Sequence, residues 1–246
     1  MKYRLDKLVL DQGNFSSRTR AIEVIENKGV CVDGTIITKP GKKFDISCEI
    51  EILKEEIPWV SRGALKLLKA IDYWDIKILN KNAIDVGAST GGFTEVLLQK
   101  GIHKVYCIDV GHGQLNSKIQ KNNRVVNFEK THIKEINSLP IDLEISLIVA
   151  DVSFISLLKV IPLIADFMPY NCELILLIKP QFEAGADKLN KHGIVKDKNI
   201  YGGIIENIKA CIEKNQLTWV DFIESPIKGG DGNIEFLSYS KKIYHN

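Results

Sequence analysis

Four short apolar runs, each with a charged residue at or near its end, recur along the second part of the chain. The runs cover residues 84–87, 105–109, 146–151 and 174–179, and their charged residues are Asp85, Asp109, Asp151 and Lys179. Short runs that are apolar throughout are typical of parallel strands buried on both faces. The pattern predicts an α/β fold with a doubly wound sheet. Because ligands bind beyond the carboxyl ends of parallel strands, we expect the four charged side chains to gather at one edge.

The first part of the chain has a different pattern, which predicts a small α+β unit over residues 1–57. Apolar positions at helical spacing predict helices over residues 4–10 and 18–27, the second with Ser16 or Ser17 as its N-cap and Gly29 as its end. Val30–Val32 and Thr35–Ile37 flank Asp33-Gly34, a strong hairpin signal. Alternation over residues 44–53 predicts one further strand.

The two parts meet at a proline. We predict a linker over residues 58–64, because Pro58 disfavours a helical conformation at the residue before it. A helix then runs from Gly63 to about Asp72, with Ser61 as its N-cap. Arg62 and Lys66 are four residues apart and share one face of this helix. The larger domain extends over residues 65–246.

Composition narrows the classes of function. The net charge of the 246 residues is only +2, so any contact with nucleic acid needs a local basic patch. Residues 1–43 provide one, with nine Lys and Arg against five Asp and Glu, a difference of +4. The five cysteines are scattered, which argues against disulfides and zinc and for a reducing compartment. No signal peptide and no uncharged apolar run of about 18 residues is present, so we expect a cytoplasmic protein without a membrane partner.

Glycines follow the first apolar run in the pattern D-x-G-x-x-x-G-G, over residues 85–92. The pattern is neither the G-x-G-x-x-G of dinucleotide-binding folds nor a phosphate-binding P-loop. It resembles motif I of the Rossmann-like methyltransferases that use S-adenosylmethionine (SAM). Asp109, at the end of the second run, can accept the ribose hydroxyls of a nucleoside. The expected SAM-binding residues are Asp85, Gly87, Ala88, Ser89, Gly91, Gly92, Phe93, Asp109 and Asp151.

The smaller unit resembles the S4-type RNA-binding domain. The resemblance rests on Arg4-Leu5-Asp6, Gly13, Ser17-Arg18 and the run from Gly29 to Gly34, in that order. It implies that basic residues of this unit contact the RNA backbone, where clustered Lys and Arg release counterions from phosphates. The expected RNA-binding residues, including one from the linker, are Arg4, Lys7, Arg18, Arg20, Lys42 and Arg62.

Nearly the whole chain resembles the TlyA family, in which an S4-type domain is joined to an FtsJ-like methyltransferase. The resemblance rests on the segments at residues 60–67, 85–94, 151–156, 179–183 and 232–237. Within them stand Lys66, Asp151, Lys179 and Glu235, in the order of the K-D-K-E catalytic tetrad of FtsJ-type enzymes. The resemblance implies SAM-dependent 2′-O-methylation of ribose in ribosomal RNA, with ribosomal RNA or ribosomal subunits as partners and no metal.

A ribose 2′-hydroxyl is a poor nucleophile and needs either a base or a cation that stabilises the developing alkoxide. We expect Lys179 to fill this role, with Asp151 orienting it and Lys66 and Glu235 completing the network. Phe182 and Trp59 are open to two interpretations. Each is either a core residue or a ring that stacks on a flipped base.

Three other functions are weighed against this one. The first is an RNA-binding protein with a catalytically degenerate methyltransferase fold, and the second is a cytolysin, because many members of the family carry the label hemolysin. The third is a small-molecule methyltransferase, which leaves the basic smaller unit without a purpose. The target nucleotide, the subunit and the oligomeric state stay open.

Overall fold

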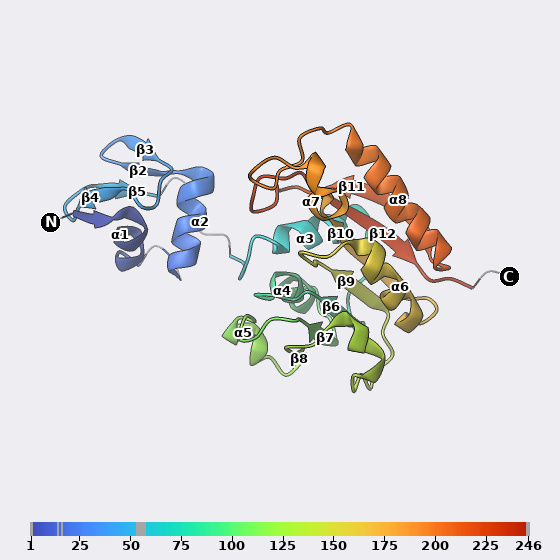
Figure 1. The fold of residues 1–246 in the computed structure, drawn as a ribbon. Coiled ribbons are helices and arrows are strands. Elements are labelled where there is room, and N and C mark those ends of the chain that lie inside the picture. Colours follow the sequence, from blue (N-terminus) through green and yellow to red (C-terminus); the bar gives the residue numbers. More distant parts are fainter. Residues whose placement is uncertain (1, 14, 16, 53–57, 245–246) are drawn as a thin grey trace. The chain divides into compact units, whose positions relative to one another are not determined.

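The computed structural model divides the chain into two compact units, residues 1–58 and 59–246 (Figure 1). It describes residues 2–13, 15, 17–52 and 58–244. The division lies at the edge of the segment predicted as a linker.

Two helices and two small sheets form the smaller unit. Its elements are β1 (Lys2–Arg4), α1 (Leu5–Asp11), α2 (Arg18–Lys28), β2 (Val30–Val32), β3 (Thr35–Ile37), β4 (Lys43–Asp45) and β5 (Ile50–Glu51). Strand β1 pairs with β4, while β2 pairs with both β3 and β5, all antiparallel. The core lies between the helices and the second sheet, where Leu5, Val9, Ile25 and Val30 are fully buried. Ser17 caps α2 as predicted by accepting the Arg20 N–H, and Gly29 ends the helix with a positive φ.

The single strand predicted over residues 44–53 is wrong, because the chain turns within it. The Asp45 carboxylate accepts hydrogen bonds from the backbone N–H and hydroxyl of Ser47, and its carbonyl accepts the Cys48 N–H. This turn moves the chain from one sheet to the other, so β4 and β5 belong to different sheets. Residue 53 lies outside the described residues. The first helix begins at Leu5 because Arg4 pairs with Lys43 in β1.

A seven-stranded sheet with helices on both faces forms the larger unit. The strands are β6 (Asn82–Val86), β7 (Lys104–Ile108), β8 (Val125–Phe128), β9 (Leu147–Ala150), β10 (Glu173–Ile178), β11 (Thr218–Glu224) and β12 (Phe236–Lys241). The helices are α3 (Ala64–Tyr73), α4 (Gly92–Gln99), α5 (Ser117–Gln120), η1 (Ile133–Ser138), α6 (Leu157–Phe167), α7 (Pro180–Glu183), η2 (Ala186–Lys188) and α8 (Ile200–Lys214). The strand order is β11-β12-β10-β9-β6-β7-β8, and only the pairings of β12 are antiparallel. The predicted α/β class is thus confirmed.

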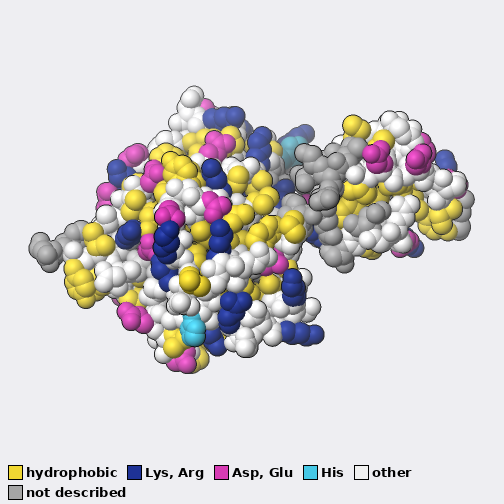
Figure 2. Space-filling model, turned by 180° about the vertical axis from the view of Figure 1, so that it is seen from behind, with side chains coloured by type: hydrophobic (Ala, Val, Ile, Leu, Met, Phe, Trp, Pro, Cys, Tyr) yellow, Lys and Arg dark blue, Asp and Glu magenta, His cyan; other side chains and the backbone are white. Residues whose placement is uncertain are grey.

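The sheet is buried on both faces, which explains why its central strands read as continuous apolar runs. One core lies under α6, α8 and η1, and the other under α3, α4 and α5 (Figure 1). Basic and acidic side chains are interspersed over the face of the larger unit seen in Figure 2, in keeping with the small net charge.

Helix α3 starts at Ala64 without the predicted side-chain cap. Its N-cap position is Gly63, which is itself helical and makes no side-chain cap hydrogen bond. The Ser61 hydroxyl accepts the Gly63 N–H at 3.2 Å, and the Ser61 carbonyl accepts the Ala64 N–H. Ser61 therefore shapes the turn that leads into the helix rather than the first helical turn.

We expect Leu97→Ala to destabilise the larger unit by about 2–5 kcal/mol, because Leu97 is fully buried in the core under α4 and its truncation leaves a cavity. Leu79→Ala is the control, since Leu79 is 69% exposed. All three tryptophans, Trp59, Trp74 and Trp219, lie in the larger unit, so the tryptophan fluorescence of urea unfolding reports on it. Equal losses for the two variants would contradict the assignment of this core.

Candidate active site

The charged residues predicted to gather do meet at the carboxyl edge of the sheet. Asp151 and Lys179 directly follow β9 and β10, and Asp109 directly follows β7. Strand β12 runs in the opposite direction, so its beginning lies at this same edge, with Phe236 paired to Ile178. Glu235, the residue before β12, therefore stands next to the exit of β10.

Two lysine–carboxylate pairs form at this edge. Lys66 Nζ, from α3, donates to Glu235 Oε2 at 2.5 Å, and both side chains are more than nine-tenths buried. Lys179 Nζ lies 2.6 Å from Asp151 Oδ1, an ion pair whose angle is not that of a hydrogen bond. Lys179 instead donates to the Ser153 hydroxyl at 2.7 Å. Ser153 stands in one of the segments that carry the resemblance, but nothing in the sequence marked it as a partner of the lysine.

The glycine loop between β6 and α4 is packed too closely for side chains. A β-carbon on Gly87, which has a φ of +80°, would lie 2.5 Å from the Asp151 carbonyl oxygen. One on Gly92 would lie 2.3 Å from the Ser61 hydroxyl, so the turn that precedes α3 packs on this loop. The backbone N–H of Val60, in the same turn, donates to the carboxylate of Glu95 at 2.6 Å. Glu95 is 4% exposed and comes from the first turn of α4.

Asp85 is fully buried beside this loop. Its Oδ2 accepts the Thr94 hydroxyl at 2.6 Å, and its Oδ1 has no hydrogen-bond partner among the described residues. Burial raises the pKa of Asp85 to about 7 against the hydrogen bond from Thr94, and the negative charges of Asp151 and Asp109 add to the rise. The carboxyl group is thus poised to change its charge near neutral pH.

Asp109 ties two loops together at the tip of β7. Its Oδ2 accepts the Ser89 N–H and its Oδ1 accepts the Gly111 N–H, both at 2.7 Å. Ser89 has a φ of +48°, so this contact fixes a left-handed turn within the glycine loop. The other predicted loop residues differ in exposure, because Ala88 and Phe93 are buried in the core below and offer only their backbones to a ligand.

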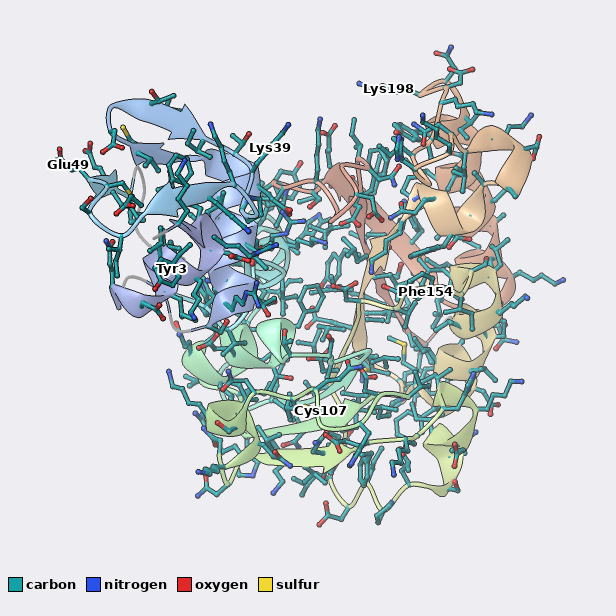
Figure 3. The ribbon with its side chains drawn as sticks, turned by 60° about the vertical axis from the view of Figure 1, so that its left-hand side comes forward. Tyr3, Lys39, Glu49, Cys107, Phe154 and Lys198 are labelled. Atoms are coloured by element: carbon teal, nitrogen blue, oxygen red, sulfur yellow. The ribbon has the colours of Figure 1, made fainter. Side chains whose placement is uncertain are left out.

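An aromatic pair stands next to Lys179. Phe154, in the loop between β9 and α6, is 92% exposed and has a φ of +61° (Figure 3). Its ring centroid lies 5.3 Å from that of Phe182, and Lys179 Nζ lies 5.9 Å from the Phe182 centroid. Trp59, the other candidate for stacking, packs partly buried against the core under α3 and α4. The sequence did not single out Phe154, because only its backbone conformation and exposure distinguish it.

The residues predicted to bind RNA are spread over both units. Arg4, Lys7 and Arg18 line one open hollow of about 520 Å³ in the smaller unit. None of the predicted catalytic residues lines this hollow.

The other three predicted RNA-binding residues lie elsewhere. Arg20 is 8% exposed and pairs with Glu23 at 3.4 Å, a position that leaves little of it for a ligand. Lys42 lies over the ring of Phe44. Arg62 belongs to the larger unit and lies beside Gly230, in the loop before Glu235.

Comparison with known proteins places this geometry in a family. The sequence profile of FtsJ-like methyltransferases matches residues 59–242, and that of the S4 domain matches residues 4–49. The chain is 42% identical to Hemolysin A of Brachyspira hyodysenteriae, over 96% of this chain and 98% of the relative. It is 34% identical to the 16S/23S rRNA (cytidine-2′-O)-methyltransferase TlyA of Mycobacterium tuberculosis, over 95% of this chain and 87% of the relative. The chain belongs to the TlyA family of FtsJ-like methyltransferases.

A solved structure agrees with this assignment. A protein of Streptococcus thermophilus, provisionally titled a hemolysin, superimposes with a TM-score of 0.77 at 36% identity, over 98% of this chain and 89% of the other. The predicted membership of the TlyA family, with an S4 domain before an FtsJ-like domain, is therefore confirmed.

The site fits SAM, the methyl donor of this family. The glycines let the loop pack directly on Asp151 and Ser61, and the buried Asp85 Oδ1 beside it is an acceptor without a partner among the described residues. Asp109 accepts two backbone N–H groups and keeps further lone pairs, which agrees with the predicted contact to ribose hydroxyls without testing it. In the described part of the chain, no group of three or more His, Cys, Asp and Glu side chains is arranged to bind a metal ion.

When no SAM is bound, the raised pKa of Asp85 predicts that the free energy of unfolding depends on pH. Between about pH 4 and about pH 7 the folded state holds a proton that the unfolded chain has lost, so the free energy of unfolding falls as pH rises. The fall is about 1.4 kcal/mol per pH unit, and it ends above about pH 7. Asp85→Asn, which keeps an acceptor for Thr94, should lack this slope. Urea unfolding of both proteins from pH 5 to 8, followed by tryptophan fluorescence, checks it, and parallel curves would contradict a raised pKa.

Proposed function

We propose that this protein transfers the methyl group of SAM to the 2′-hydroxyl of a ribose in ribosomal RNA, with Lys66, Asp151, Lys179 and Glu235 as its catalytic residues. The observation that carries the proposal is the meeting of two lysine–carboxylate pairs at the carboxyl edge of the sheet, next to the glycine loop. Because the Mycobacterium tuberculosis relative is named for cytidine, a cytidine is the nucleotide to test first. We place this activity in the cytoplasm, with ribosomal RNA or a ribosomal subunit as the partner.

The exposure of the two pairs supports Lys179 as the lysine that meets the 2′-hydroxyl. The side chains of Lys179 and Asp151 are 11% and 23% exposed, against 8% and 2% for Lys66 and Glu235, so the difference lies mainly in the carboxylates. Lys66 and Glu235 then act as the inner pair, which holds the beginning of β12 against α3. Asp151 and Ser153 both contact Lys179 Nζ, so they fix the orientation of the amine at the carboxyl edge of the sheet.

Catalysis in this arrangement is mostly positioning. Bound SAM supplies a methyl group on a positively charged sulfur. As a neutral amine, Lys179 Nζ takes the proton of the 2′-hydroxyl while the oxygen bonds to the methyl carbon and the bond from that carbon to sulfur breaks, which leaves a neutral thioether. As an ammonium, it balances the charge that develops on the oxygen, and the proton passes to water. The fixed amine removes the cost of orienting this group at the moment of reaction.

The conformation and exposure of Phe154 are evidence for a nucleic-acid substrate at the carboxyl edge of the sheet. A bulky side chain with positive φ is strained by about 1–2 kcal/mol, and an exposed ring recovers little of this cost by burial. Such strain is characteristic of functional sites. We propose that Phe154, backed by Phe182, stacks on a base of the RNA and holds its ribose near Lys179.

The same observations give less support to two of the rival functions, the catalytically degenerate RNA-binding protein and the cytolysin. A protein without catalytic activity would not need two lysine–carboxylate pairs, with the Ser153 hydroxyl beside Lys179, at one edge of the sheet. The name hemolysin belongs to relatives, and no helix in the described part of this chain is long and apolar enough to cross a lipid bilayer.

Lys179→Ala should lower the rate of methylation by about 10²–10⁴-fold, because the 2′-hydroxyl loses its base or its stabilising cation. The assay uses radiolabelled SAM with separated ribosomal subunits, followed by digestion of the RNA and identification of the labelled nucleoside. Lys77→Ala removes an exposed lysine that pairs with the exposed Asp75 after the end of α3, and this variant should keep full activity. Near-normal labelling by Lys179→Ala with SAM still bound would refute its role, and label on a base rather than a ribose would refute the reaction.

Phe154→Asn should separate stability from activity. Asparagine tolerates positive φ, so the free energy of unfolding should rise by about 1 kcal/mol, while loss of the ring should lower kcat/KM for RNA roughly tenfold. Phe154→Tyr keeps the ring and should keep activity. Unfolding by urea and initial rates at varied RNA concentration check both halves. An unchanged kcat/KM in Phe154→Asn would rule out the stacking contact.

A further inference from the structure

One carboxylate is fully buried beneath the hollow of the smaller unit. Asp6, in the first turn of α1, is 0% exposed and accepts hydrogen bonds from two arginines. Arg4 donates from Nε to Oδ1 at 3.0 Å and from Nη2 to Oδ2 at 2.9 Å. Arg18 donates from Nε and Nη2 to Oδ2 at 3.1 and 3.0 Å. Asp6 thus fixes two guanidinium groups side by side.

The fold brings these three residues together from three elements. Arg4 ends β1 and pairs with Lys43, while the Asp6 N–H donates to the Pro40 carbonyl and anchors the start of α1. Arg18 is the first residue of α2, whose position Ser17 sets as the N-cap. The geometry of the arginine pair is therefore built into the core packing of α1 on α2.

The outer sides of both arginines remain open. Their side chains are 47% and 55% exposed, although each guanidinium is tied to the buried Asp6. A guanidinium has five N–H donors and Asp6 takes two from each, so donors remain for a ligand in the hollow. Planar N–H donors in a fixed fork match the two free oxygens of a phosphodiester.

The charge of the hollow selects an anion. The five basic residues that line it are Lys2, Arg4, Lys7, Arg18 and Lys43. Among the described residues that line it, Asp11 is the one acidic residue, and Tyr3, labelled in Figure 3, also lines it. The arginines hold the pKa of Asp6 below its usual range, so the carboxylate stays charged and the pair stays fixed at neutral pH.

We propose that Asp6 is a positioning residue that presents Arg4 and Arg18 as a fixed clamp for a phosphate of the RNA backbone. The inference rests on the proposed function and names the group in the smaller unit that organises RNA binding. It also makes an unusual prediction. Removing the negative charge of Asp6 should weaken RNA binding, although the unit becomes more basic, because the loss of the fork geometry outweighs the gain in charge.

The test compares Asp6→Asn with Asp11→Asn in the full chain. Both substitutions remove one negative charge from the same unit. Asp11 also lines the hollow but is exposed, and within the described part of the chain it forms no ion pair with Arg4 or Arg18. Filter binding of purified 16S and 23S ribosomal RNA at several salt concentrations gives the affinity and the salt slope. We expect Asp6→Asn to bind RNA roughly tenfold more weakly than wild type. The slope of its log affinity against log salt concentration should be smaller by the equivalent of about one phosphate contact. Asp11→Asn should bind as tightly as wild type or more tightly. Equal or tighter binding by Asp6→Asn would overturn the clamp.

Methylation kinetics separate the clamp from a structural defect. Asp6→Asn should raise KM for RNA and leave kcat and SAM affinity unchanged, because the catalytic residues lie in the other unit. Amide hydrogen exchange of α1 and α2 tests whether the smaller unit still folds. If the smaller unit of Asp6→Asn does not fold, the double variant Arg4→Lys with Arg18→Lys replaces it in the test. This variant keeps Asp6 and the net charge but lacks the paired N–H donors of the two guanidinium groups. A tenfold loss of affinity in it supports the clamp, and wild-type affinity overturns it.

The clamp and the proposed function fail in different ways. If wild-type protein binds RNA through the clamp but transfers no methyl group, the binding experiment supports the clamp and the reaction is wrong. If wild-type protein methylates RNA and Asp6→Asn is indistinguishable from it, the reaction stands and the clamp is wrong.

Discussion

The candidate site depends on the reversed direction of one strand. Because β12 runs antiparallel to β10, the chain returns at its end to the edge where the parallel strands exit. This direction puts Glu235 beside Lys179 and within reach of Lys66, 169 residues earlier. A parallel last strand would place Glu235 at the opposite edge, and Lys66 would be left as a buried charge. Loss of one partner from a buried pair typically costs about 3–5 kcal/mol, so the strand order and the tetrad support each other.

The crowding of like charges at this edge has an electrostatic consequence. Asp85, Asp109 and Asp151 follow or end neighbouring parallel strands, so their carboxylates repel each other across the top of the sheet. Lys179 offsets this repulsion at Asp151, and two backbone N–H groups offset it at Asp109. Asp85 is fully buried and accepts a neutral hydroxyl from Thr94. Burial first, and the neighbouring charges second, raise its pKa to about 7.

The sequence predicted what depends on pattern and missed what depends on packing. The apolar runs and their charged exits predicted the sheet and its functional edge, because strand direction alone brings Asp151 and Lys179 together. The strand over residues 44–53 failed because alternation continues through a turn that changes sheets. The strain at Phe154 was equally invisible, since no residue type signals a positive φ in a phenylalanine. Charge counting marked Arg20 as a candidate for RNA contact, although the structure buries it against Glu23.

The turn before α3 has a practical meaning for anyone who separates the two units. The Ser61 hydroxyl packs against Gly92 in the glycine loop, and the Val60 N–H donates a hydrogen bond to Glu95 in the first turn of α4. A fragment that starts at residue 65, the predicted start of the larger domain, would keep the glycines of the loop and all four tetrad residues. It would still lack Ser61 and Val60, which pack on the glycine loop and on the first turn of α4. A fragment of the larger unit should therefore begin no later than Trp59, so that the turn before α3 stays with the glycine loop on which it packs.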